Sequence, residues 1–199
     1  MKKTLIPKLI FSYVLFVVLG FIILCTFTQH AITHYAENRE AQQLYRESVQ
    51  IASGYADNYN KYSFSLQDFQ KQMQSLGEYL SAQIWIMDNQ GNILFDSTDE
   101  SVGKNAANAN YKTLKGFNTS DFGNRYYMTG NFYGSFSEKN LTVFSPITSN
   151  YRIHSYVMIH KTVSSITQNA NGFMNIVFYT IEFVFLTALF LLLLFAHGF

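Results

Sequence analysis

The chain has 199 residues, of which 48% are hydrophobic and 14% are charged, and its 14 Lys and Arg residues nearly balance its 13 Asp and Glu residues. Soluble domains usually carry about 25% charged residues, so the composition favours a protein with membrane-embedded parts. The balanced charge excludes a strongly basic nucleic-acid-binding protein, and the single cysteine excludes a disulfide framework and a cysteine-based zinc site.

The first predicted element is a membrane-spanning helix over residues 9–28, which carry no charged side chain. A helix needs about 20 such residues to cross a bilayer. Lys2, Lys3 and Lys8 precede the span, and cytoplasmic flanks carry the excess of Lys and Arg. The apolar stretch is longer than that of a secretory signal, and no small-residue cleavage site follows it. We therefore expect an uncleaved signal anchor in a bacterial cell membrane, with residues 1–8 in the cytoplasm and residues 29–172 outside.

A long helix is predicted to continue from the span to about residue 60. A heptad-like stripe runs along it and comprises Ala41, Tyr45, Ser48, Ala52 and Tyr55. This stripe could face a second copy of the chain or the sheet of its own domain, and the sequence does not separate the two arrangements. The partner that we expect is a second copy, in a homodimer that uses Ala41, Tyr45, Ala52 and Tyr55 together with the membrane helices.

A second, amphipathic helix of about 15 residues is predicted to begin after Ser65, which is a suitable N-cap with Asp68 three positions on. Its apolar face repeats at helical spacing and consists of Leu66, Phe69, Met73, Leu76 and Leu80. Such a helix packs its apolar face on a core.

Five strands are predicted after this helix. Residues 83–97 form a hairpin, because Asp88 and Asn89 favour a turn and Gly91 supplies a positive φ. Residues 98–123 are polar and irregular, with a short helix predicted around Tyr111–Leu114. Further strands are predicted over residues 125–133, 140–148 and 152–161. Their short connections predict an antiparallel sheet with the helices on one side, which is an α+β fold.

The last predicted elements are a short helix over residues 163–172 and a second membrane span over residues 173–195. Glu182 lies near the middle of this span, where a carboxylate costs about 3 kcal/mol. The surrounding Leu, Ile, Val and Phe residues outweigh that cost at roughly 0.3 to 0.6 kcal/mol each. Glu182 is then either a neutral carboxyl group that hydrogen-bonds between helices or a functional group. Residues 196–199 contain no basic residue, and we expect them to begin a cytoplasmic part of a longer protein.

Three segments resemble the extracytoplasmic PAS-like sensor domains of the Cache (PDC) type. Residues 84–97 are similar to the family pattern of an apolar strand, Asp-x-x-Gly, a second apolar strand and Asp-Ser. Residues 134–147 are similar to its Gly-x-Phe and Leu-x-Val-x-x-Pro-Ile segments. Residues 155–160 resemble its last strand, although Ser155 stands where glycine often precedes the aromatic residue. The resemblance implies a PAS-like sheet between a long N-terminal helix and a second membrane helix.

The resemblance also implies a function, which is the transmembrane input module of a bacterial two-component sensor histidine kinase. An extracellular small ligand or physical stimulus would act through the two membrane helices on a cytoplasmic kinase outside these 199 residues. Two alternatives remain open: the sensor module of a chemotaxis-type receptor or cyclic-dinucleotide enzyme, and a stand-alone membrane scaffold or regulator. Neither the effector nor the stimulus follows from the residues.

The candidate site also follows from the resemblance, which implies a ligand pocket on the sheet face under the irregular segment. Trp85, Tyr126, Met128, His154 and Tyr156 could line this pocket, or the same side chains could fill an ordinary core. Asp96 could bind an amine or cap the irregular segment. The sequence contains no metalloprotease, serine hydrolase, P-loop or dinucleotide-binding motif. We therefore expect no catalytic residue, metal or cofactor in these residues.

Overall fold

The computed structural model describes residues 5–59, 66–99, 112–122 and 125–198. The chain divides into two compact units. One unit combines Met1–Ala36 with Thr167–Phe199 and is called the helix pair below. The other unit, Glu37–Ile166, is called the sheet domain.

The helix pair is formed by the first part of α1 (Leu5–Tyr59) and most of α3 (Val163–Gly198). Two stretches of these helices, within Ile10–Ala56 and Met174–Leu194, are long and apolar enough to cross a membrane. The long N-terminal helix is confirmed as one continuous element. The helix predicted over residues 163–172 is confirmed as the first part of α3, which continues into the apolar stretch without a break.

The sheet domain contains a five-stranded sheet in the order β2-β1-β5-β4-β3, and every neighbouring pair is antiparallel. The strands are β1 (Gln83–Asp88), β2 (Ile93–Asp96), β3 (Tyr127–Gly130), β4 (Asn140–Ser149) and β5 (Arg152–Thr162). The predicted α+β class and the antiparallel sheet are therefore confirmed.

Two local predictions between the strands are wrong. β3 ends at Gly130 rather than at Tyr133, because Phe132 and Tyr133 adopt left-handed backbone angles in a turn. The short helix around Tyr111–Leu114 is absent over its described residues, since Thr113 instead forms an antiparallel bridge with Asn92. Tyr111 itself lies outside the described residues.

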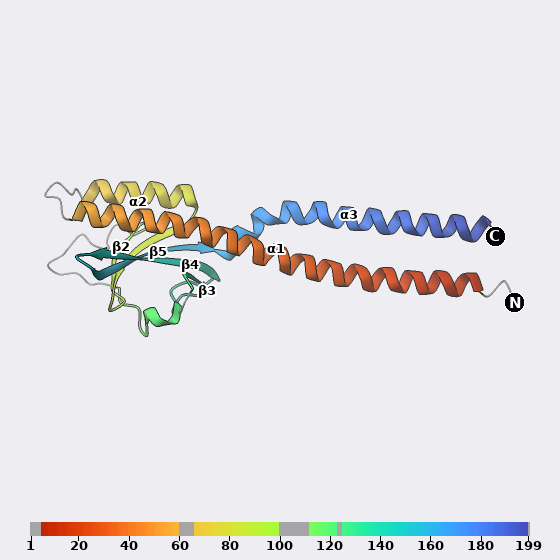
Figure 1. Ribbon diagram of the computed structural model, residues 1–199, viewed down its shortest axis with the longest axis horizontal. Coiled ribbons are helices and arrows are strands. Elements are labelled where there is room, and N and C mark those ends of the chain that lie inside the picture. The colour runs from red at the N-terminus through yellow and green to blue at the C-terminus, as the bar shows by residue number, and fades with distance from the viewer. Residues whose placement is uncertain (1–4, 60–65, 100–111, 123–124, 199) are drawn as a thin grey trace. The chain divides into compact units, whose positions relative to one another are not determined.

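One face of the sheet is covered by α1 and by α2 (Leu66–Leu80) (Figure 1). The face of α1 that is buried within the chain consists of Ala41, Leu44, Ser48, Ile51 and Ala52. These positions recur at helical spacing, and three of them, Ala41, Ser48 and Ala52, have small side chains. Ile84, Ile86, Val157 and Ile159 are also buried. They alternate along β1 and β5 with the residues that line the opposite face, and so point toward the helices.

The stripe on α1 therefore faces the chain's own sheet, which is the second of the two arrangements left open above. Ala41 and Ala52 are buried there, Tyr45 packs on Tyr126 with 4.7 Å between ring centroids, and Tyr55 packs on Phe69 at 5.3 Å. A dimer contact of α1 would have to use other residues of the helix. The homodimer itself stays a prediction.

The amphipathic pattern of α2 is confirmed by its burial. The helix spans 15 residues, and Phe69, Met73 and Leu80 are buried. Ser81 adopts a left-handed φ of 49° directly after the helix, and the Ala82 amide donates to the carbonyl of Gly77. This ending turns the chain into β1. The proposed N-cap Ser65 lies outside the described residues.

The opposite face of the sheet carries the larger aromatic cluster. Its buried members are Trp85, Met87, Ile93, Leu114, Phe122, Phe132, Tyr156 and Met158. The chain segment that covers this face includes the short 3-10 helix η2 (Thr119–Phe122). It lies on the side of the sheet away from α1 and α2 (Figure 1). The sheet therefore lies between two layers, and residues 112–122 and 131–136 contribute to the second one.

The β1–β2 hairpin forms as the turn chemistry predicts. The Asp88 carboxylate accepts hydrogen bonds from the amides of Gln90 and Asn92, both at 2.9 Å. Gly91 adopts a φ of 86°, which costs a residue with a side chain about 1 to 2 kcal/mol. A Cβ atom on Gly91 would also lie only 2.9 Å from Cβ of Phe117, so this turn requires glycine for two reasons.

Replacing Gly91 with alanine is expected to lower the free energy of unfolding by about 3 kcal/mol, because the backbone penalty and the contact with Phe117 add. Gly116→Ala is the matched control, since Gly116 also has a positive φ of 78° but open space around its Cβ position. The control should cost only the backbone term of about 1 kcal/mol. Equal losses for the two variants in chemical denaturation would contradict the steric argument.

Candidate functional site

Three of the six predicted pocket residues come together on the sheet face opposite the helices. Trp85 and Tyr156 belong to the buried aromatic cluster, and Met128 packs against it. Trp85 is 1% exposed and Tyr156 is 9% exposed. Side chains of the chain itself surround all three, so the structure places them in a packed core.

Asp96 and Tyr126 lie elsewhere. The Asp96 carboxylate is held by the side-chain amide of Gln83 and by the Thr98 amide and hydroxyl, at 2.8 to 2.9 Å. These bonds close the end of the β1–β2 hairpin, which agrees with the capping alternative. Tyr126 packs on Tyr45 of α1, and α1 lies on the other side of the sheet. Neither residue therefore joins the cluster around Trp85.

His154 is also separated from the other predicted residues. The pairing of β4 with β5 shifts register between Ile147 and Thr148, so the strict alternation that would place His154 beside Tyr156 breaks near the turn. His154 instead borders a cavity of about 360 Å³. That cavity is lined by Tyr55, Ala56, Leu94, Ile147, Ser149, Asn150, His154 and Ser155. The six predicted pocket residues are thus spread over four places, and only Trp85, Met128 and Tyr156 lie together.

The sheet domain contains a buried histidine that is enclosed by aromatic rings. This residue is His160 of β5, and it is 2% exposed. Its ring centroid lies 4.4 Å from that of Trp85, 4.7 Å from that of Phe132 and 4.9 Å from that of Phe136. Trp85 in turn stacks on Phe136 at 5.3 Å. Three aromatic rings therefore enclose the imidazole, and we call these four residues the histidine cage.

The histidine cage contains two unsatisfied polar atoms. His160 Nδ1 lies 2.8 Å from the Thr142 hydroxyl oxygen. His160 Nε2 and Trp85 Nε1 are buried and have no hydrogen-bond partner among the described residues. A buried polar atom without a partner usually costs about 1 to 3 kcal/mol. Burial also lowers the pKa of His160 from its ordinary 6.5 to about 3, so the ring is neutral at physiological pH.

A strained turn covers the histidine cage. Phe132, Tyr133 and Gly134 are three consecutive residues with positive φ, at 42°, 53° and 74°. Residues other than glycine adopt such angles at a cost of roughly 1 to 2 kcal/mol each. The Tyr133 hydroxyl donates to the Asp121 carboxylate at 2.6 Å, and partial burial, followed by this hydrogen bond, raises the pKa of Tyr133. Phe132 also contacts Phe122 of η2, and Tyr133 contacts Asn118 and Phe117 just before it, so several side chains hold the turn to this segment.

A second polar arrangement lies near the end of β5. The Lys161 ammonium donates to the Glu40 carboxylate of α1 at 2.6 Å, and both side chains are largely buried. The Tyr127 hydroxyl of β3 donates to the side-chain oxygen of Asn38 at 2.8 Å. β5 ends at Thr162 and α3 begins at Val163. α1 is thus fixed to the strand that leads directly into α3.

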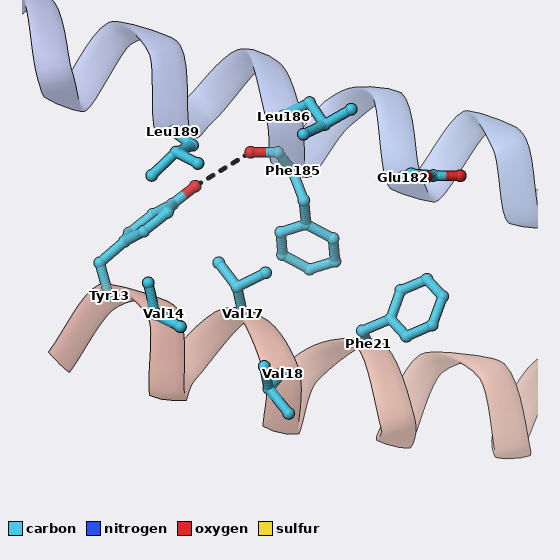
Figure 2. A pocket seen from close by; sticks show the side chains of 9 residues that line it. All are labelled: Tyr13, Val14, Val17, Val18, Phe21, Glu182, Phe185, Leu186 and Leu189. Carbon is cyan, nitrogen blue, oxygen red and sulfur yellow. Dashed lines mark hydrogen bonds between the residues drawn. The ribbon is translucent and has the colours of Figure 1, made fainter. Parts of the chain in front are cut away.

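The helix pair has its own shallow groove, of about 230 Å³ (Figure 2). Tyr13, Val17 and Phe21 of α1 point toward Phe185 and Leu189 of α3, as Figure 2 shows. The Tyr13 hydroxyl donates to the Phe185 carbonyl oxygen at 3.2 Å. Glu182 lines the same groove and is exposed. In the part of the helix pair that the structure describes, this predicted intramembrane carboxyl group forms no ion pair and no hydrogen bond.

The sequence indicated part of the histidine cage. The alternation of β5 places His160 on the same face as Tyr156 and Met158. The burial of His160 depends on Phe132 and Phe136, which lie in the segment predicted as strand or loop. The two neighbouring residues with left-handed angles, Phe132 and Tyr133, carry no turn signal of the glycine or asparagine kind. The turn at Phe132 and Tyr133, which covers the histidine cage, could therefore not be predicted from local residue preferences.

No group of three or more His, Cys, Asp or Glu side chains able to hold a metal ion occurs among the described residues. The chain matches no protein-family model, and the search of curated proteins finds no relative. The function therefore has to be argued from the geometry of this chain alone.

Proposed function

We propose that the chain is the transmembrane input module of a sensor protein, of the kind that precedes a histidine kinase. In this proposal the sheet domain lies outside a bacterial cell membrane, the apolar stretches of α1 and α3 cross it, and the N-terminus is cytoplasmic. The three lysines before residue 9 support this orientation, because basic flanks stay in the cytoplasm. A homodimer, which would place four spans together, is part of the same proposal.

The observation that carries the proposal is the direct connection between the sheet domain and both apolar helices. α1 is one helix that is apolar in its first part and packs on the sheet in its last part. β5 passes into α3 without an intervening loop. A stimulus can be transmitted only when it favours one of two helix arrangements over the other. The continuous connections supply a path for such a difference.

The Lys161–Glu40 ion pair supports the proposal because it ties these two connections together. Lys161 is the second-last residue of β5, and Glu40 lies on the face of α1 toward the sheet. A displacement of β5 that carried Lys161 away from Glu40 would expose two charged groups that are now largely buried. The contact therefore links the position of α1 to the position of the strand that begins α3.

The test is a chimaera in which residue 199 is joined to the cytoplasmic half of a sensor kinase with a measurable phosphorylation output. Lys161→Met removes the ammonium group and keeps the apolar stem. We expect this change to shift the basal output about fivefold or more, which is the lower range of couplings between sites. Lys139→Met is the matched control, because Lys139 is 61% exposed and only 4.0 Å from Glu37. Its output should stay within about twofold.

Membrane topology is checked in the same chimaera. Cys25 is the only cysteine, so Tyr151→Cys in a Cys25→Ser background introduces a unique thiol at the fully exposed tip of the β4–β5 turn. A membrane-impermeant maleimide should label it in intact cells. Labelling only after lysis would refute the orientation. An unchanged output of Lys161→Met in a correctly inserted, folded chimaera would refute the coupling.

A further inference from the structure

We propose that the groove of the helix pair binds a membrane-spanning helix of another protein, one that carries a Lys or Arg residue near its middle to pair with Glu182. This inference rests on the proposed crossing of the membrane by α1 and α3, and not on the sheet domain or on any signalling output. Three observations carry it: the depth of Glu182, the lack of a complementary group among the described residues of the helix pair, and the apolar groove beside the carboxyl group.

Glu182 lies deep within the apolar stretch of α3. That stretch runs from Met174 to Leu194, and Glu182 is its only charged residue. A helix rises about 1.5 Å per residue, so Glu182 lies about 12 Å along the helix from the nearer end of the stretch. Long Lys and Arg side chains near helix ends can reach the membrane surface, but the shorter glutamate side chain at this depth cannot. Its carboxyl group therefore has to find a partner inside the membrane.

The hydroxyl groups of the helix pair do not serve Glu182. The hydroxyl groups of Tyr13, Thr180 and Thr187 each donate to a backbone carbonyl oxygen of α3, at 2.8 to 3.2 Å. These hydrogen bonds occupy the donors that the two apolar stretches could offer to a carboxylate. The complementary group for Glu182 therefore has to come from outside the described helix pair.

A second copy of the chain does not bring the complementary charge. Residues 9–28 and 174–194 contain no Lys, Arg or His, so a homodimer would place Glu182 beside another Glu182 or beside uncharged side chains. Like charges repel each other, and the repulsion is strongest in a medium of low dielectric constant. Charged residues inside membranes commonly pair with one another. The occupant that fits is therefore a helix of a different protein with a basic residue at this depth.

The groove beside Glu182 gives such a helix a surface to pack on. It has a volume of about 230 Å³ and, apart from Glu182, is lined by apolar and aromatic side chains of both helices (Figure 2). Val14 and Val18 on the α1 side are 46% and 50% exposed, so the groove is open to a neighbouring helix. Helices associate in membranes through close packing and interhelical polar contacts. The groove supplies the packing surface and Glu182 supplies the polar contact.

The test measures association with model peptides of defined sequence. The full chain, labelled with a donor dye at Cys25, its only cysteine, is reconstituted in phosphatidylcholine vesicles with acceptor-labelled single-span peptides of leucine and alanine. One peptide carries a central Lys, a second a central Met and a third a central Glu. Energy transfer is recorded as the peptide-to-lipid ratio rises. We expect the Lys peptide to associate about tenfold more tightly than the Met peptide, and equal association of these two peptides would overturn the proposal.

A matched pair of variants on α3 tests the role of the carboxylate. Glu182→Gln removes the negative charge and nearly keeps the shape of the side chain. It should reduce the preference for the Lys peptide to about twofold or less. Thr187→Val is the control, because Thr187 is also exposed on α3 but does not line the groove, and it should keep the full preference. An undiminished preference in Glu182→Gln would overturn the proposal.

The groove has its own matched pair of variants. Val18→Phe puts a larger side chain into the groove and should weaken association of the Lys peptide about fivefold, because the helices can no longer pack closely. Val184→Phe adds the same ring to α3 at a position that is 58% exposed and does not line the groove. Its effect should stay within about twofold. Equal effects of the two changes would overturn the groove as the packing surface.

Two further measurements distinguish this surface from the homodimer and from the sensor function. Energy transfer between donor-labelled and acceptor-labelled copies of the chain should be the same for wild type and Glu182→Gln. A loss of that transfer in Glu182→Gln, together with association of the Glu peptide as tight as that of the Lys peptide, would assign Glu182 to a contact between copies and overturn the proposal. Failure of the chimaera in the kinase assay, with the preference for the Lys peptide intact, would instead refute the sensor function and retain this surface.

Discussion

Acidification from pH 7 to pH 4 is expected to lower the free energy of unfolding of the sheet domain by about 3 kcal/mol through His160 alone. The folded-state pKa of about 3 lies below the ordinary 6.5, because burial disfavours the charged ring. The unfolded chain therefore binds the proton first as the pH falls. The stabilisation is complete above about pH 6.5 and is progressively lost between pH 6.5 and pH 3.

Chemical denaturation of the full chain in detergent at several pH values measures this loss, with His160→Gln as the test variant. The carboxylates of the chain also contribute to acid sensitivity, so the quantity of interest is the difference in slope between wild type and His160→Gln. His154→Gln is the matched control, because His154 lies on the same strand but is exposed. Parallel pH profiles for wild type and His160→Gln would show that burial does not lower the pKa of His160 in the fold.

Direct titration of His160 by NMR in the wild-type chain guards against a variant that does not fold. Its ring should remain neutral at pH 5, whereas His154 serves as the exposed reference on the same strand. A His160 signal that titrated near pH 6.5 would contradict the burial described here.

The second large effect is expected for Leu44→Ala, which should lower the free energy of unfolding by about 3 kcal/mol. Leu44 is completely buried on the face of α1 that packs on the sheet. Truncation removes apolar contact and leaves a cavity that a helix and a sheet cannot fully close. Val49→Ala is the matched control on the same helix, because Val49 is 40% exposed. Its cost should lie within about 0.5 kcal/mol.

The Leu44 measurement also separates the two arrangements of the α1 stripe. If the stripe packs on the chain's own sheet, the loss is independent of protein concentration. If the stripe formed a dimer contact instead, the unfolding midpoint of the wild type would fall on dilution and the effect of Leu44→Ala would shrink with it. Repeating the denaturation over a hundredfold range of protein concentration, at constant detergent concentration, distinguishes the two arrangements.

Elements with local chemical signals could be predicted from the sequence. The β1–β2 hairpin follows from Asp88 and Gly91, whose turn chemistry acts within four residues. The amphipathic helix α2 follows from the spacing of Phe69, Met73 and Leu80. The two apolar stretches follow from length and hydropathy alone. In each case the residues that determine the element lie inside the element.

The rest depended on contacts between distant residues. The α1 stripe of small and tyrosine side chains suits a helix partner and a sheet equally well. Its partner could therefore be identified only from the position of the sheet. His154 was predicted beside Tyr156 because alternation was assumed to continue to the turn, and the register shift near Thr148 ends that alternation. The histidine cage depends on Phe132, whose left-handed backbone is imposed by packing rather than by its own preference.

The order of the strands limits how copies of the sheet domain can associate. The strands at the two edges, β2 and β3, have four residues each, whereas the central β4 and β5 have ten and eleven. On the β2 side, amide and carbonyl groups of Ile93 and Gly91 are already bonded to Lys112 and Leu114. Short and occupied edges offer few free backbone groups for strand addition. The edges of the sheet therefore disfavour intermolecular strand pairing. Copies of the domain that associate would have to do so through side-chain contacts.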